Sequence, residues 1–351
     1  MSANDPSNPS PEALQLEIRK MEPKDADGLV QCVHRCYGSS YPNPILYDPK
    51  KLGTALNEGL LHSVIALDPK GNELIGHCAL SFDEPGDPVP EAGKLLVDPS
   101  YRGHHISDQL SKVRHQEAIT LGIPGYWSAC VTNHPFSQDE IIATGGYETG
   151  LLVNGQPSSV HMEGLNNIAE VRHSLIPFFI PLLKNKPLEV FLPKHHHAFF
   201  KSLNANLGLP RTIGDASSGK APSNQGSIAT SSNRAGAVEY LHIRVDGYDV
   251  IDDVRDQIQQ SESLQAPVIY IDIPIHHPDS VQLIEGLEDL GFFWGAWLPH
   301  FGADGDILRL QKLIDHRIDA QDIVCARPAG EACKAYILAE QKRVGLNQDN
   351  T

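Results

Sequence analysis

The sequence contains no apolar run that approaches the roughly 20 residues needed to cross a lipid bilayer. Its first residues, MSANDPSNPSPE, contain neither a basic segment nor an apolar one, so they do not have the form of a secretion signal. We therefore expect no membrane partner and a cytoplasmic location.

Cysteine and basic residues are also scarce. The 6 cysteines include no CxxC pair and are too sparse for a disulfide framework, so we expect reduced thiols. Lysine and arginine number 28 against 44 aspartates and glutamates, which gives a formal charge of -16. Such a chain repels the phosphate backbone of nucleic acids and favours cationic partners such as amines. We therefore expect no nucleic-acid partner.

Motifs of several other protein classes are missing as well. No P-loop and no serine or cysteine nucleophile motif occurs in the chain. Three consecutive histidines, His195, His196 and His197, have no acidic or cysteine companions at the spacing typical of a metal site. We interpret them as a solvated basic run and expect no metal.

The length of 351 residues favours two domains, and the mixture of strand-like and helix-like segments predicts an α/β fold with a mixed sheet. A strand, His-Pro, a helix and a glycine followed by an aromatic residue occur in this order at 126–147 and again at 268–292. This repeat suggests duplication, although one pair of matches can also arise by chance. The predicted divisions are a disordered tail (1–12), a first domain (13–165), a second domain (166–345) with a disordered insertion (212–237), and a tail (346–351).

In the first half, the hydrophobic pattern predicts the elements around a site. Asp25 precedes an apolar stripe that ends at Gly38, as in a capped amphipathic helix. The loop 38–49 either walls a pocket or packs only on its own core. Ser137 is expected to cap a short helix that ends at Gly145. Strands are expected at 14–19, 62–67, 74–82, 94–97, 126–132, 147–153 and 158–163.

The most informative segment is EAGKLLVDPSYRGHHISDQL, residues 91–110. A strand rich in leucine and valine runs into Asp98-Pro99 and then into Arg102-Gly103, at the expected start of an amphipathic helix that stops at Gly122. The free N–H groups at such a helix start, together with the helix dipole, suit a pyrophosphate. Gly103 lets the backbone turn closely, and Arg102 adds a positive charge. The segment therefore predicts a site for a phosphate-bearing cofactor.

Within this segment, VDPSYRGHHIS resembles motif A of the GNAT family of N-acetyltransferases, usually V-x-P-x-x-[Q/R]-x-x-G-x-[G/A]. Arg102 takes the Q/R place, while His105 replaces the later glycine and Ser107 the last small residue. The element order from 14 to 163 also resembles this fold, and the whole chain looks like bacterial tandem acetyltransferases with a degenerate second domain.

This resemblance implies two tandem copies of the acyl-CoA N-acyltransferase fold. The second copy is expected to bind no cofactor, because 248–265 contains no Arg-x-x-Gly. In the first copy the resemblance implies that acetyl-CoA contacts Leu96, Val97, Arg102, Gly103, His104, His105, Ile106, Ser107 and Asn133. Asn133 is explained equally well as a turn former before His-Pro.

The resemblance further implies transfer of an acetyl group to an amine, with a carboxylate that removes the proton of the amine. Glu91 lies eleven residues before Arg102, which is the spacing of a catalytic glutamate in some members of the family. The presence of Glu91 is explained equally well as that of a polar residue after a Pro-rich turn. His77 and Asp83 are weaker alternatives.

One residue that the resemblance would supply is missing. The tyrosine that protonates the departing thiolate in many members would fall near Ile142, and that helix contains none. The alternative is therefore a catalytically inactive acyl-CoA-binding module with a regulatory or interaction role. The sequence leaves the amine acceptor and the oligomeric state open.

Overall fold

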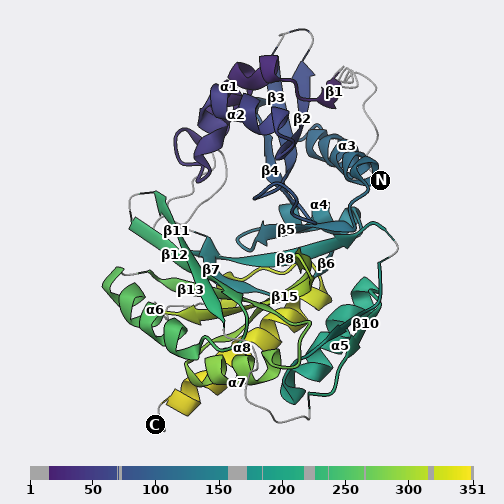
Figure 1. The fold of residues 1–351 in the computed structure, drawn as a ribbon. Helices are drawn as coiled ribbons and strands as arrows, with labels where there is room; N and C mark the ends of the chain where they lie inside the picture. Colours follow the sequence, from purple (N-terminus) through teal and green to yellow (C-terminus); the bar gives the residue numbers. More distant parts are fainter. Residues whose placement is uncertain are drawn as a thin grey trace, which may run out of the picture.

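The structure, a computed structural model, describes residues 16–68, 70, 73–156, 172–183, 185–216, 226–235, 237–264, 266–314 and 320–348. The N-terminal half forms the upper part of the molecule in Figure 1 and the C-terminal half the lower part, each around its own β-sheet. Both sheets contain parallel and antiparallel pairs, so the predicted mixed α/β fold is confirmed.

The first sheet has the strand order β1-β2-β3-β4-β5-β8-β6, with β7 paired to β8. Among its described strands, β4 and β5 are parallel and the other pairs are antiparallel. β8 extends this sheet beyond the boundary predicted at residue 165, and the predicted strand 158–163 lies outside the described residues. The strands are β1 (Glu17–Lys20), β2 (Leu61–Asp68), β3 (Glu73–Ser81), β4 (Glu91–Val97), β5 (Gly125–Val131), β6 (Tyr147–Glu148), β7 (Leu152–Gln156) and β8 (His173–Pro181).

Helices cover both faces of this sheet because successive strand residues point to opposite sides. On β2, Ile65 packs in the core beneath α1 (Ala26–Tyr37) and α2 (Pro49–Asn57), whereas Val64 and Ala66 pack in the core beneath α3 (Ile106–Leu121). The short helix α4 (Phe136–Ala143) follows β5. The 3-10 helices η1 (Pro23–Asp25) and η3 (Pro99–Tyr101) precede α1 and α3.

Two local predictions are wrong. The segment 38–49 is not irregular throughout, because it contains the 3-10 helix η2 (Pro44–Tyr47), and Asp48 caps α2 by accepting from the N–H groups of Lys50 and Lys51. Proline is tolerated in the first turn of both helices, where its missing N–H has no intrahelical partner. Ser137 is not a cap, since α4 already begins at Phe136 after Pro135.

The second sheet has the order β11-β12-β13-β15-β14, with β12 and β13 parallel and the other pairs antiparallel. In the first sheet, the neighbouring strands of the order β3-β4-β5-β8-β6 repeat this sequence of antiparallel and parallel pairs. A duplication would give this arrangement, and the duplication stays a prediction. The strands are β11 (Ser227–Ala235), β12 (Ala237–Asp246), β13 (Val268–Pro274), β14 (Phe293–Gly302) and β15 (Gly305–Leu313), and β9 (Leu188–Val190) pairs separately with β10 (Arg211–Ile213).

The predicted disordered insertion, 212–237, is wrong for the residues that the structure describes there. β10 occupies its start, and β11 pairs with β12 along nine Cα pairs. Its Ser-, Thr- and Asn-rich composition gives no apolar signal, because backbone bonds to the neighbouring strand rather than side-chain burial hold an edge strand. The remaining part, 217–225, lies outside the described residues.

The helices of the second half lie mainly below its sheet in the view of Figure 1, on the side that faces away from the first half. The predicted tail from 346 is wrong for its first residues, because the last helix, α8, continues to Gln348. The predicted tail 1–12 lies outside the described residues. The helices are η4 (Lys194–His196), α5 (His197–Leu207), α6 (Ile251–Leu264), α7 (Ser280–Asp289), η5 (Ala320–Asp322) and α8 (Pro328–Gln348). Among the described residues, none of the helices combines the length and apolar character that a bilayer span requires.

One continuous hydrophobic core joins the two halves. Phe178 on β8 and Trp294 on β14 belong to the same cluster, and both are fully buried. Gly150 forms a bridge with Ala296, and a Cβ at Gly150 would lie 2.0 Å from the carbonyl oxygen of Gly295. The halves are therefore in direct backbone contact, which places second-half residues beside the site described next.

Candidate active site

β4 and β5 are joined at one end and separate toward the other. Glu91 and Trp127 are Cα partners, and the Trp127 N–H donates to the carbonyl of Pro90 (3.1 Å) at the same end. No further Cα pair joins these two described strands toward their carboxyl ends, Val97 and Val131. The gap therefore opens at the edge where parallel strands present ligands.

A β-bulge bends β4 at this gap. β3 and β4 pair at Ala79–Gly93 and again at His77–Leu96, so β4 has one extra residue between these pairs. Lys94 lies in this stretch with φ 55°, a left-handed conformation that is uncommon outside glycine. A bulge increases the local twist of its strand and so helps to separate β4 from β5.

His77 supports the bulge from inside the sheet. The ring is fully buried, with Nδ1 2.9 Å from the Lys94 carbonyl oxygen and Nε2 2.9 Å from the Ser63 hydroxyl. Burial lowers the pKa of His77 to about 4, so the ring is neutral at pH 7. Nδ1–H must then donate to the carbonyl, and Nε2 accepts from Ser63. Because both nitrogens have partners, His77 fits a supporting role rather than that of a base.

The segment after β4 presents a row of backbone N–H groups. Asp98 accepts from the Ser100 N–H (2.9 Å) and is also hydrogen bonded to Arg35 of α1. Burial alone would raise the pKa of Asp98, but the bonds from Arg35 and Ser100 outweigh it and lower this pKa. In the described part of the chain, the N–H groups of residues 103–107 have no hydrogen-bond acceptor. Such a row at the positive end of a helix suits an anion.

The predicted helix start at Arg102-Gly103 is wrong. Gly103 (φ 83°) and His105 (φ 55°) are both left-handed, and together they make a turn that delays α3 to Ile106. The N–H row therefore lies on this turn as well as on the first turn of α3. The His105 side chain is 85% exposed and bonds Asp108 (3.0 Å), so the ring points into solvent instead of packing into the turn.

The other residues of the predicted cradle are placed in different ways. The side chains of Leu96 and Ile106 are buried in the cores on opposite faces of the sheet, so these residues can offer a ligand only backbone groups. Arg102 is half-buried, and its Nε donates to the Val97 carbonyl (3.4 Å). His104 is exposed, while Val97 and Ser107 are half-buried.

The turn between β5 and α4 holds polar atoms that lack partners. The Oδ1 of Asn133 and the Oγ of Ser137 are buried without a hydrogen bond among the described residues. An unsatisfied buried polar atom costs about 1–3 kcal/mol, so such atoms point to a polar ligand. Both follow the carboxyl end of β5, the strand parallel to β4, and therefore belong to the same edge as the N–H row. Backbone N–H groups that can bind an anion therefore follow β4, and the polar side chains of Asn133 and Ser137, which can bond an amide, follow β5 across the gap.

A cavity of about 280 Å³ adjoins Glu91 between the two halves. Glu91 and Trp127 belong to its first-half wall, and Asp246 of β12 and Phe301 of β14 to its second-half wall. The rings of Trp127 and Phe301 meet edge to face, with their centroids 5.6 Å apart. The seven carboxylates that line it are Asp83, Asp87, Glu91, Asp246, Asp272, Asp304 and Asp306.

These carboxylates leave the cavity negative. Asp272 is bonded to Arg309 (2.7 and 2.8 Å) and Asp306 to Arg211 (2.7 and 3.0 Å), so both are neutralised. In contrast, no ion pair involves Asp246 or Asp304 among the described residues. Among the described residues of the lining, Arg244 is the one lysine or arginine. A negative cavity with aromatic walls attracts organic cations.

Glu91 lies at the joined end of β4 and β5 and lines the cavity. Its side chain is 36% exposed, and Lys94 Nζ lies 3.7 Å from its Oε2 while donating to Ser81 Oγ (2.6 Å). Burial raises the pKa of Tyr41, and the nearby charges of Tyr37 and Glu91 add to this effect. In the segment 38–49, Leu46 belongs to the core beneath α1 and α2, and Tyr41 packs against this core. None of the described residues that line the cavity belongs to this segment, so the pocket-wall alternative stays a prediction. The exposed carboxylate is accessible to a substrate amine.

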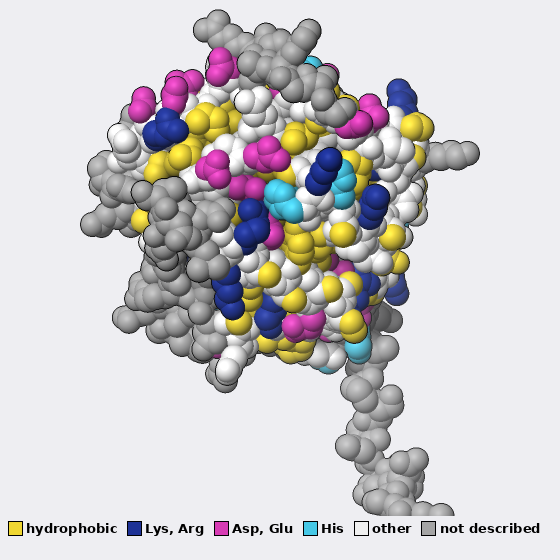
Figure 2. All heavy atoms as spheres, turned by 90° about the horizontal axis from the view of Figure 1, so that it is seen from below, with side chains coloured by type: hydrophobic (Ala, Val, Ile, Leu, Met, Phe, Trp, Pro, Cys, Tyr) yellow, Lys and Arg dark blue, Asp and Glu magenta, His cyan; other side chains and the backbone are white. Residues whose placement is uncertain are grey.

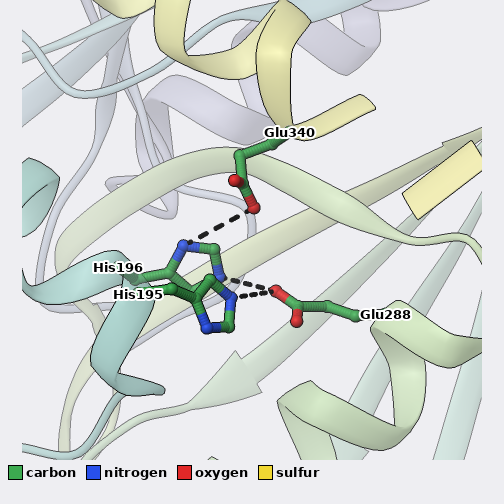
Figure 3. A group of neighbouring side chains, drawn as sticks. All are labelled: His195, His196, Glu288 and Glu340. Carbon is green, nitrogen blue, oxygen red and sulfur yellow. Dashed lines mark hydrogen bonds and ion pairs between the residues drawn. The ribbon is translucent and has the colours of Figure 1, made fainter. Parts of the chain in front are cut away.

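The histidine run has a different place from the one predicted. His196 is fully buried, so the predicted solvated run is wrong: its Nε2 lies 2.7 Å from Glu288 Oε1, and its Nδ1 lies 2.7 Å from the Tyr336 hydroxyl. Figure 3 shows Glu288 facing both His195 and His196, with Glu340 on the opposite side of the His196 ring. The tertiary structure supplies these acidic partners from α7 and α8, far along the chain.

This cluster offers four metal-ligand atoms within 4.8 Å of one another. However, Arg343 already lies 2.9 Å from Glu288 Oε1 and 2.6 Å from Glu340 Oε2. Figure 2 views the molecule from below. It shows basic, acidic and histidine side chains close together near the middle of this face. The guanidinium supplies the positive charge that a metal would bring, and the expectation of no metal stays a prediction.

Comparisons with known proteins concern the fold. No protein-family model matches the sequence, and no curated protein matches it either. Solved structures similar to this chain include N-acetyltransferases. The ribosomal-protein-S5-alanine acetyltransferase from Vibrio fischeri is 13% identical, with TM-score 0.38, over 49% of this chain and 96% of its own. A GNAT-family acetyltransferase from Streptococcus pneumoniae (16%) and a mosquito arylalkylamine N-acetyltransferase-like protein (17%) each have TM-score 0.38, over 48% of this chain and all of their own.

Sequence reasoning did not find half of the cavity. The carboxylates of the second-half wall lie on β12, β13, β15 and the turn between β14 and β15, more than 150 residues after Glu91. Their only sequence signal is the net charge of -16, which favours cationic partners without saying where they bind. Lys94 was also missed, because a bulge has no pattern in an otherwise regular apolar strand.

Proposed function

We propose that this protein is an acetyl-CoA-dependent N-acetyltransferase whose acceptor is a cationic amine. The observation that carries the proposal is the position of Glu91. It pairs with Trp127 at the end where β4 and β5 are joined and lines the negative cavity there, while the N–H row follows the opposite end of β4. A donor and an acceptor can therefore reach the same carboxylate from opposite sides.

On the donor side, the N–H groups of 103–107 would hold the diphosphate of coenzyme A. Asn133 and Ser137 would pair with the amide-bearing arm that follows the gap between the strands. When bound, acetyl-CoA supplies the acetyl thioester. Backbone groups of the β4 bulge would hold the carbonyl oxygen of this thioester by hydrogen bonding.

On the acceptor side, an ammonium group would enter the cavity and lose a proton to Glu91. The neutral nitrogen would then form a bond to the acetyl carbon while the bond from that carbon to sulfur breaks, and the second proton that the nitrogen loses would go to the departing thiolate. The thiol has a pKa of ~8.5, so its thiolate can leave near neutral pH without a tyrosine acid. Most of the catalytic effect would come from positioning the two substrates.

The experiment has two stages. Isothermal titration with acetyl-CoA tests the donor site, and a thiol-release assay over monoamines, diamines, polyamines and peptide N-termini tests transfer. We expect binding with 1:1 stoichiometry per chain and CoA release that depends on the amine. Binding without release for every acceptor would favour the inactive acyl-CoA-binding module, and no binding would refute both.

Glu91→Gln tests the base directly. We expect unchanged affinity for acetyl-CoA and a kcat reduced by about 10²-fold, the smallest loss typical of a general base. The loss should shrink as the pH rises, since more of the free amine is then already neutral. Asp87→Asn, in the same cavity wall, is the matched control and should keep the wild-type pH dependence of kcat. Equal pH–rate profiles for Glu91→Gln and the wild type would exclude Glu91 as the base.

A further inference from the structure

A short segment of the second half reaches back to the donor side of the site. Residues 323–327 connect η5 to α8, and they lie against the turn that follows β5. The Val324 N–H donates to the carbonyl of Thr132 (2.8 Å), the residue directly before Asn133. The second half therefore contacts the backbone next to an unsatisfied polar side chain of the site.

Gln138 of α4 links this segment to the end of β5. Its Nε2 donates to the carbonyls of Val131 (3.0 Å) and Val324 (2.9 Å), and its Oε1 accepts from the Ala326 N–H (2.9 Å). The side chain is 1% exposed, so these bonds are shielded from water. One buried amide thus joins three backbone groups, two of which belong to the second half.

Arg327 holds the segment that follows α4 and leads into β6. Its guanidinium forms a bidentate pair with Glu148 (2.9 and 2.6 Å) and donates to the carbonyl of Gly146 (2.9 Å). It also stacks over the ring of Tyr147, 4.7 Å from the centroid. Glu148 is 2% exposed, and a paired buried carboxylate of this kind holds its partner firmly in place.

We propose that residues 324–327 are an intramolecular clamp that sets the affinity of the donor site for coenzyme A. The proposal rests on the proposed function, because it assigns the clamp an effect on the same cofactor. α4 has only two turns, and helices of this length owe their stability to tertiary contacts. The clamp holds the first turn of α4 and the segment that follows this helix, and α4 with its preceding turn presents Asn133 and Ser137. The second half thereby pre-organises the donor side and also walls the acceptor cavity.

The test compares Gln138→Met with the wild-type full chain. Methionine preserves the length of the side chain but removes all three bonds, so the turn 132–137 should become less ordered. We expect the Kd for coenzyme A to rise about tenfold and the KM for acetyl-CoA to rise with it, while the KM for the amine changes less than twofold. Hydrogen exchange at the Val324 and Ala326 amides should accelerate in the same variant.

Two further variants separate positioning from a general loss of stability. Arg343→Met breaks the pair with Glu340 in the second half and should lower the melting temperature without changing the Kd for coenzyme A. Gln138→Glu can donate only while its carboxyl is protonated, so its affinity relative to the wild type should recover as the pH falls from 8 to 5.

The outcomes distinguish this proposal from the proposed function. If the wild type binds coenzyme A and folded Gln138→Met binds it equally well, the clamp is refuted and the function stands. If the wild type does not bind it, the proposed function fails, while the exchange rates still report whether the segment orders the turn. Equal exchange in the variant and the wild type refutes the clamp in either case.

Discussion

His77→Asn should weaken the pH dependence of protein stability in the acidic range. In the folded protein, burial lowers the pKa of His77 from 6.5 to about 4. Because the folded pKa is depressed, the neutral ring contributes its full stability above pH 6.5. This contribution is lost as the pH falls toward 4, since the unfolded chain then binds one proton more than the folded chain.

The size of the effect follows from the same two pKa values. At 1.36 kcal/mol per pH unit, the interval from 6.5 to about 4 corresponds to roughly 3 kcal/mol of unfolding free energy. Asparagine does not titrate but can still donate to the Lys94 carbonyl in place of Nδ1. It leaves the Ser63 hydroxyl without a partner, which should cost about 1–2 kcal/mol at pH 7.5.

Urea unfolding at pH 4.5, 5.5, 6.5 and 7.5 measures both effects. We expect the variant to be less stable than the wild type at pH 7.5 and equally or more stable at pH 4.5. Ser63→Ala is the matched control, because it removes the same hydrogen bond and keeps the titrating ring. Parallel stability curves for His77→Asn and the wild type would refute the neutral, buried ring and with it the account of the β4 bulge.

Three other changes test separate parts of the structure. Gly103→Pro should raise the Kd for coenzyme A by at least tenfold, because φ 83° is closed to proline; unchanged affinity would show that the anion site is elsewhere. Gly150→Ala should lower the unfolding free energy by about 1–3 kcal/mol or more, because the added Cβ would lie 2.0 Å from the Gly295 carbonyl oxygen. A variant with the melting temperature of the wild type would contradict this close contact. The double change of Asp246→Asn and Asp304→Asn should raise the KM for a diamine about tenfold with the KM for acetyl-CoA unchanged, and equal effects on both substrates would argue against a cation site in the cavity.

The sequence alone determined the elements whose signals are local. The α3 helix, the strands on either side of it and the hairpin of β2 and β3 follow from apolar periodicity and from the glycine at 122. The N–H row before α3 was also predictable, because Asp98, Pro99 and Gly103 each specify a backbone conformation within a few residues. Even there the exact helix start was missed, since His105 adopts a left-handed conformation that its residue type does not require.

Only the tertiary structure decided what is built from distant segments. β11 was missed because its ordering comes from bonds to β12, and the burial of His196 was missed because Glu288 and Tyr336 lie about 90 and 140 residues further along the chain. The negative cavity and the contact of 324–327 with α4 likewise depend on how the two sheets pack. Local sequence patterns reflect the conformations that neighbouring residues prefer. A site between the two halves depends instead on loop closure and packing between distant segments, and a single sequence contains no periodic signal for these.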